Sequence, residues 1–155
     1  MEHWIIQIVM RYVHIVSAIL LVGGTAFIAM VMRPCLLRVE DGVRASVQKL
    51  TLDRFIRIVW IGITGLVISG VYNWIAFAAT YRELGPAGHS LIGMKVLLAM
   101  ILFALVWANR IGLVKLTQRA YLMINLHLAA MVILIAVILR YLRLAHFNDL
   151  IGGGS

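Results

Sequence analysis

Four long apolar segments dominate this 155-residue chain and decide what it can fold into. They cover residues 5–32, 55–80, 91–109 and 120–141. Each is about as long as the 20 residues that a helix needs to cross the hydrocarbon core of a bilayer. Hydrophobic residues make up 63% of the chain and charged residues only 13%, which excludes an ordinary soluble domain. The pattern predicts an all-α integral membrane protein, and its partner is the lipid bilayer.

The basic residues predict how the helices are oriented. Nine flank the first and third connections: Arg33, Arg38, Arg44, Lys49, Arg54, Arg57, Arg110, Lys115 and Arg119. The opposite side has four or five: Arg11, Arg82, Arg140 and Arg143, with Lys95 near it. The positive-inside rule then places both termini outside the cytoplasm. This distribution favours contacts with anionic lipid headgroups over nucleic-acid binding, despite the net charge of +8.

The connections predict a four-helix antiparallel bundle in a single domain over residues 1–151. The first connection, residues 33–54, is the only long one, and residues 43–52 have the pattern of a short interfacial helix. Residues 85–88, Gly-Pro-Ala-Gly, predict a turn. Residues 152–155 have the composition of a linker. Segment 5–32 is too long for a signal peptide, and the single Cys35 excludes an internal disulfide framework.

Polar residues gather near the predicted outer end of every segment. Counting from the basic boundaries places His14 roughly 4–5 Å inside the outer surface, with Lys95 at a similar depth. The same layer is predicted to hold Arg11, Tyr72, Asn73, Arg140 and Tyr141. A titratable side chain inside hydrocarbon costs several kcal/mol by insertion scales, so such residues are candidates for function. The simpler alternative for Lys95, Arg11 and Arg140 is snorkelling to the headgroups.

Histidine is the residue type here that best fits a cofactor. The neutral imidazole of His14, inside a span, is a common ligand of haem iron, or it could relay protons. His89 and His146 lie near the same outer face and are further candidate metal ligands. His127 lies roughly 13 Å away from His14 in depth, so two stacked haems suit the pair better than one. A helix-to-helix hydrogen bond is the alternative for His127.

Glycines allow close approach in the first two segments. Gly23 and Gly24 lie in the first, and Gly62, Gly65 and Gly70 in the second. They predict either plain helix packing through small residues or a flat macrocycle lying against them.

Parts of the sequence resemble a known membrane-protein family. The run from His14 to Gly24, continuing to Arg33-Pro34, resembles the opening helix of the copper-resistance protein D-like (CopD-like) proteins, a group that includes the small HemJ-type protoporphyrinogen oxidases. Other resembling runs are Arg54-Phe55 with Thr64-Gly65 and Ser69-Gly70, then Leu91 to Leu98, and Met123 to Asn125.

The resemblance implies a bundle that binds haem b, with His14 at the haem-linked histidine and Lys95 at the family's helix-3 lysine. Three positions depart from the oxidases: Leu21 lies near their tryptophan, Gly93 replaces a histidine, and Leu126 replaces a glutamate. These departures argue against porphyrinogen oxidation more than against haem binding. The resemblance also implies a bacterial inner-membrane location.

These observations predict a haem-b-binding membrane protein, with one or two haems and a redox role towards a quinol or a porphyrinogen-type substrate. Lys95, Arg140 and Arg11 would pair with the haem propionates. Copper transport is an alternative, because Met30, Met32 and Cys35 offer soft ligands that suit Cu(I). The third candidate function is that of a membrane scaffold without a cofactor. Association into a homo-oligomer through glycine-lined faces is compatible with each of these three functions.

Overall fold

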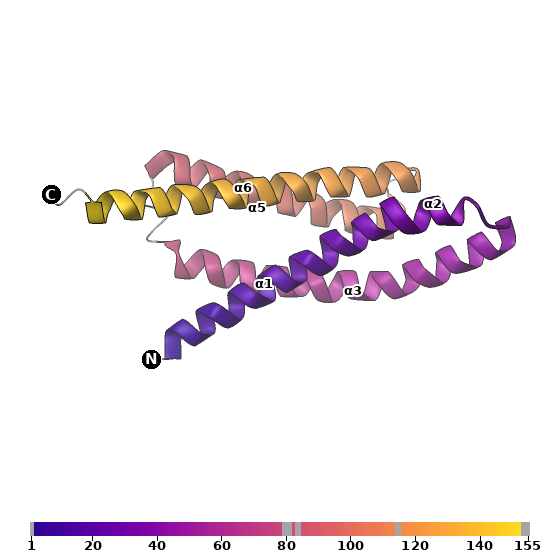
Figure 1. Ribbon diagram of the computed structural model, residues 1–155, viewed down its shortest axis with the longest axis horizontal. Helices are drawn as coiled ribbons and strands as arrows, with labels where there is room; N and C mark the ends of the chain where they lie inside the picture. The colour runs from indigo at the N-terminus through magenta and orange to yellow at the C-terminus, as the bar shows by residue number, and fades with distance from the viewer. Residues whose placement is uncertain (1, 79–81, 83–84, 114–115, 153–155) are drawn as a thin grey trace. The chain divides into compact units, whose positions relative to one another are not determined.

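The computed structural model describes residues 2–78, 82, 85–113 and 116–152 (Figure 1). Its helical elements are α1 (Glu2–Phe27), η1 (Ile28–Met32), α2 (Arg33–Leu36), α3 (Asp41–Ala76), α5 (Gly85–Arg110) and α6 (Gln118–Gly152). Within these residues there is no strand, and four helical runs are long and apolar enough to cross a membrane: Trp4–Leu36, Asp41–Ala76, Gly88–Arg110 and Gln118–His146. The predicted all-α membrane class and its four spans are confirmed.

The second span begins much earlier than predicted. Residues 43–52 are not a separate interfacial helix, because α3 runs without a break from Asp41 to Ala76. No proline interrupts this stretch, and Asp41 in the first turn suits the positive end of the helix dipole. Asp41 also pairs with Arg44 one turn later, at 2.6 Å. The long first connection is therefore mostly helix.

The third span also begins earlier than predicted, and the fourth ends later. Residues 85–88 start α5 instead of forming a turn, since proline is tolerated in the first turn of a helix, where its missing N–H has no partner to lose. Residues 79–81 and 83–84 of the predicted outer connection lie outside the described residues. The last helix, α6, continues to Gly152, so that residue belongs to the helix; residues 153–155 of the predicted linker lie outside the described part.

A π-helical turn, η1, separates α1 from α2. Its cause is Pro34, which has no N–H to donate to the carbonyl of Met30 and whose ring would clash with that carbonyl in a regular α-helix. The wider turn relieves this clash without ending the span. Its residues Ile28 and Ala29 are buried.

The chain forms two compact units. The first contains Met1–Ile75 and Thr117–Leu126, and therefore α1, η1, α2, nearly all of α3 and the first turns of α6. The second contains Ala76–Leu116 and His127–Ser155, and therefore α5 and the remainder of α6.

Small residues let α1 and α3 pack closely in the first unit. A Cβ added at Gly62 would lie 2.8 Å from Cγ of Leu21, and one added at Gly65 would overlap Oγ of Ser17. A Cβ at Gly24 would likewise overlap the ring of Phe55. These glycines pack against side chains of the facing helix, as the plain-packing interpretation predicts, and they leave no room for a macrocycle against them.

The buried positions of both helices recur every three or four residues. On α3 the buried or half-buried positions are Phe55, Val59, Gly62, Leu66, Ser69 and Asn73, and on α1 they are Met10, His14, Ser17, Leu21, Gly24 and Ile28. This spacing is that of a coiled-coil seam, in which two helices keep one face towards each other over several turns. The seam ends in an apolar cluster, where Ile28, Ala29 and Leu122 pack with Leu52 and Phe55.

In the second unit, a glycine ends α5. Gly112 has a φ of +75°, which side chains other than glycine rarely adopt. The N–H of Leu113 donates to the carbonyl of Ala108 at 3.0 Å, and that of Gly112 to the carbonyl of Asn109 at 3.4 Å. This pair of bonds is a Schellman motif, so the last carbonyls of the helix are satisfied. On α6, Ala129, Ile135 and Leu139 are buried.

Candidate functional site

His14 is held against α3 near one end of the α1–α3 seam. Its Nδ1 lies 2.9 Å from Oγ of Ser69, a hydrogen bond between two spans. A Cβ added at Gly70 would lie 3.6 Å from Cε1 of His14, so the ring edge with Nδ1 and Cε1 lies close to the α3 backbone.

Ser69 determines which nitrogen of His14 carries the proton. It is completely buried, and its hydroxyl donates to the carbonyl of Gly65, one turn earlier, at 2.5 Å. A hydroxyl has one hydrogen, so Oγ can then only accept from His14. Nδ1 therefore carries a proton, and in the neutral imidazole Nε2 then has the lone pair. The bonds form a short chain from His14 through Ser69 to Gly65.

Two further polar groups lie on this seam. Ser17, one turn after His14, is buried and packs on Gly65. Asn73, one turn after Ser69, has a buried Oδ1 that has no hydrogen-bond partner among the described residues. A buried acceptor without a partner costs about 1–3 kcal/mol, which marks Asn73 as a position where a donor is expected.

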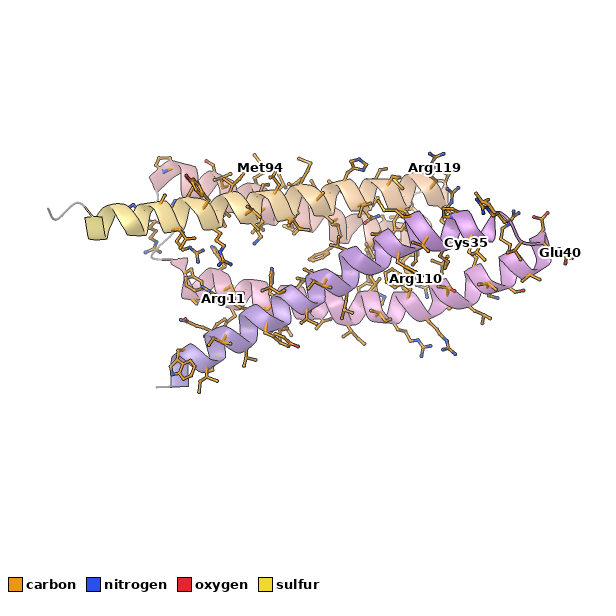
Figure 2. The ribbon with its side chains drawn as sticks, viewed as in Figure 1. Arg11, Cys35, Glu40, Met94, Arg110 and Arg119 are labelled. Carbon is orange, nitrogen blue, oxygen red and sulfur yellow. The ribbon has the colours of Figure 1, made fainter. Side chains whose placement is uncertain are left out.

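Tyr72 and Arg11 are the other predicted residues of the first unit. Tyr72 is half-buried, and Arg11 is exposed in the first half of α1, where Figure 2 labels it. The structure therefore brings His14 into contact with Ser69 and Gly70, and places Asn73 on the same seam. Ser17 and Ser69 were not among the predicted site residues. Their signal was the three- and four-residue spacing that places them on the faces of His14 and Asn73.

The second unit holds the remaining predicted residues. Lys95 on α5 is half-buried, while Arg140 and His127 on α6 are exposed. His89 on α5 is exposed and His146 on α6 is half-buried. Arg143, which was not a predicted site residue, lies over the ring of Phe77 at 4.6 Å from its centroid. This cation–π contact positions a guanidinium within the same unit as Lys95.

The soft ligands of the copper alternative lie on different sides of the first span. Met30 is 61% exposed, whereas Met32 packs against the cluster of Ile28 and Leu122. Cys35 is exposed on α2, and Figure 2 labels it well away from Arg11 along the span. The two methionine side chains of η1 therefore do not converge.

Comparison of the chain with protein-family models, with curated proteins and with solved structures finds no match.

Proposed function

We propose that this protein is a multi-pass membrane protein that binds haem b through His14 and has a redox role. The observation that carries the proposal is the hydrogen-bond chain from His14 through Ser69 to the carbonyl of Gly65. It fixes a histidine inside a membrane span in the tautomer that leaves the lone pair on Nε2. The resemblance of the first span to the CopD-like proteins adds to this proposal.

The chemistry of this pair fits a ligand for iron. A histidine that binds a metal through one nitrogen usually donates the N–H of the other to a nearby acceptor, which fixes the ring and raises its basicity. Ser69 supplies that acceptor, and because it is held by Gly65 it cannot turn away. The orphaned Oδ1 of Asn73 is a second polar group on the same seam.

The packing limits where a macrocycle would fit. The faces of Gly24, Gly62 and Gly65 are filled by the facing helix, so these glycines would not hold a haem. Haem supplies one-electron redox chemistry when it is bound. The residues of this chain hold the imidazole, exclude water from the buried Ser69, and supply a cation for the propionates. Arg11, in the same unit as His14, is the proposed cation, and a quinol or porphyrinogen is the proposed electron partner.

Visible spectra of the purified protein test this proposal directly. We expect oxidised protein from a haem-sufficient host to show a Soret band, and dithionite to produce sharp α and β bands. Pyridine haemochrome quantitation would give one haem per chain if His14 alone ligates, and two if His127 holds a second. A colourless protein would contradict the proposal and favour copper transport or a scaffold.

His14→Ala is the decisive variant, and His127→Ala is the matched variant with which it is compared. We expect His14→Ala to lose the haem absorption while the protein still inserts and elutes as a folded species. His127→Ala should keep the spectrum in the one-haem case and lose half of it in the two-haem case. A full spectrum in His14→Ala would remove His14 as the ligand.

We also propose that the four spans form an antiparallel bundle in a bacterial inner membrane, with both termini outside the cytoplasm. The support is the charge asymmetry of the connections. Cys35, exposed and the chain's one cysteine, is a native probe of this orientation.

In intact cells freed of their outer membrane, a membrane-impermeant maleimide should not label Cys35, and it should do so after the membrane is opened. The matched variant carries Cys35→Ala and Ser90→Cys, which moves the thiol to an exposed position at the start of α5. That thiol should be labelled in intact cells. The reverse result would invert the proposed orientation.

A further inference from the structure

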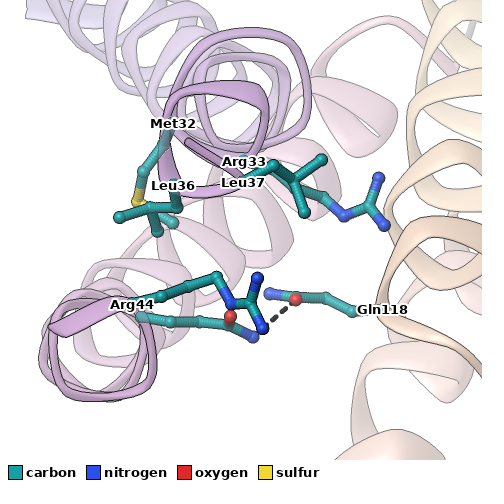
Figure 3. A pocket seen from close by; sticks show the side chains of 7 residues that line it. Met32, Arg33, Leu36, Leu37, Arg44 and Gln118 are labelled. Atoms are coloured by element: carbon teal, nitrogen blue, oxygen red, sulfur yellow. Dashed lines mark hydrogen bonds between the residues drawn. The ribbon is translucent and has the colours of Figure 1, made fainter. Parts of the chain in front are cut away.

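The first unit contains a small pocket at the opposite end of the seam from His14. It has a volume of about 120 Å³ and lies among α2, α3 and the first turn of α6 (Figure 3). Its polar lining is Arg33, Arg44, Gln48 and Gln118, and Met32, Leu36 and Leu37 form an apolar wall. Pockets for drug-sized ligands are usually 300–1,000 Å³, so this one suits a small group.

Positive charge dominates the pocket. Figure 3 shows Arg33 and Arg44 extending from α2 and α3 towards the side on which Gln118 lies. Asp41 pairs with Arg44, but its side chain is 86% exposed, and such surface pairs are weak. In the described part of the chain no carboxylate pairs with Arg33. The lining therefore holds two guanidinium groups against one solvated carboxylate beside it.

Gln48 and Gln118 add amide groups to the lining, and Gln118 lies at the N-terminus of α6. Gln48 Nε2 donates to Gln118 Oε1 at 2.6 Å, which orients the Gln118 amide so that its NH₂ group keeps its donors for other partners. Gln118 begins α6, whose first turn contains no acidic residue. The positive end of the helix dipole at this point is therefore not neutralised by a side chain of that turn.

We propose that this pocket binds a phosphate group, carried either by a membrane phospholipid or by free phosphate. Arginine's planar fork matches phosphate oxygens, and two of them with an amide donor form a suitable set. The apolar wall continues into Leu37, which is 61% exposed, so an acyl chain would find apolar contact beside the phosphate. This site is separate from His14 and does not depend on haem.

Native mass spectrometry of the full-length protein in detergent, with phosphatidylglycerol titrated as the probe, tests the proposal. We expect the wild type to retain one lipid per chain. Arg33→Gln and Arg44→Gln should each weaken retention about tenfold, because a hydrogen bond to a charged group contributes roughly that factor. The matched controls are Arg38→Gln and Arg57→Gln, which remove the same charge at exposed positions outside the pocket.

Lysine variants distinguish a loss of phosphate binding from a loss of folding. Arg33→Lys and Arg44→Lys keep the charge but lose the planar fork, so we expect binding weaker than wild type and stronger than in the glutamine variants. Inorganic phosphate added at millimolar concentration identifies the source: competition indicates a site that takes free phosphate, and no competition assigns it to the lipid. Equal loss in pocket and control variants, or no retained lipid together with no phosphate binding by equilibrium dialysis, would overturn the proposal.

Discussion

The helices α3 and α5 are both apolar, both long enough to span a membrane, and both carry glycines and one notable polar group, yet their surroundings differ. Along α3 the glycines face close neighbours in α1, and Ser69 is completely buried. Along α5 a Cβ at Gly93 would meet nothing within 4 Å, and only 6% of its most apolar 18-residue stretch is buried, against 17% of the corresponding stretch of α3.

This difference between α3 and α5 shows which polar residues of a span are held in position by helix packing. In hydrocarbon, helices gain little from burying apolar side chains against each other, so small residues and hydrogen bonds specify a contact. The α1–α3 seam has both, and His14 is fixed there. Lys95 on α5 has no hydrogen bond to another described residue, the nearby Gly93 makes no close helix contact, and its sequence neighbours Met94 and Leu97 are exposed.

Matched glycine substitutions should show the largest contrast. We expect Gly62→Leu to destabilise the protein by about 1–3 kcal/mol or more, because even its Cβ would lie 2.8 Å from Leu21 and the seam would be forced apart. Gly93→Leu should change stability by about 0.5 kcal/mol or less, since the position is open. SDS-induced unfolding of the reconstituted protein measures both, and equal losses would remove the contrast between the helices.

Removing the Ser69 hydroxyl sharpens the comparison at the proposed haem ligand. Because partners of this kind change metal affinity by about 10–100-fold, Ser69→Ala should weaken haem retention by that factor while the helices remain paired. Nitrogen-15 NMR of the His14 ring in haem-free protein provides an independent check: the proton should lie on Nδ1 in the wild type and shift partly to Nε2 in the variant. An unchanged tautomer would contradict the role given to Ser69, whether or not haem binds.

Lys95→Met tests whether α5 takes part in the site at all. If Lys95 pairs with a propionate, the variant should retain haem more weakly or have an altered midpoint potential. Lys95→Arg, which keeps the charge, is the control. An unchanged redox titration in the methionine variant would favour snorkelling to the headgroups.

The smallest effect is expected at the end of α5. Gly112→Ala should cost about 1 kcal/mol, because a side chain at a positive φ crowds the next carbonyl. Gly93→Ala on the same helix should be neutral or slightly stabilising, since its helical backbone suits alanine better than glycine. The same SDS unfolding assay compares the two, and equal effects would contradict the Schellman assignment.

The spans were predictable from the sequence because hydrocarbon imposes a simple length and composition. The ends of the spans were less predictable. Gly85 and Pro86 have the pattern of a turn but start α5, since a helix tolerates both residues in its first turn. His14 was predictable as an unusual residue in a span. Its partner Ser69 was not, because hydroxyls are common in membrane helices and only the pairing of α1 with α3 distinguishes this one.

The π-helical turn before Pro34 acts as an angular phase shift within one continuous span. The seam on α1 advances through Ser17, Leu21, Gly24 and Ile28, and an unbroken repeat would continue to Val31 and Cys35. Instead Met32 and Leu36 turn inward, one position later, while Val31 and Cys35 are exposed. Deleting a single residue from this turn would rotate all that follows by about 100°. One proline thus determines the direction in which the Arg33 side chain projects from the span, independently of the face that carries His14.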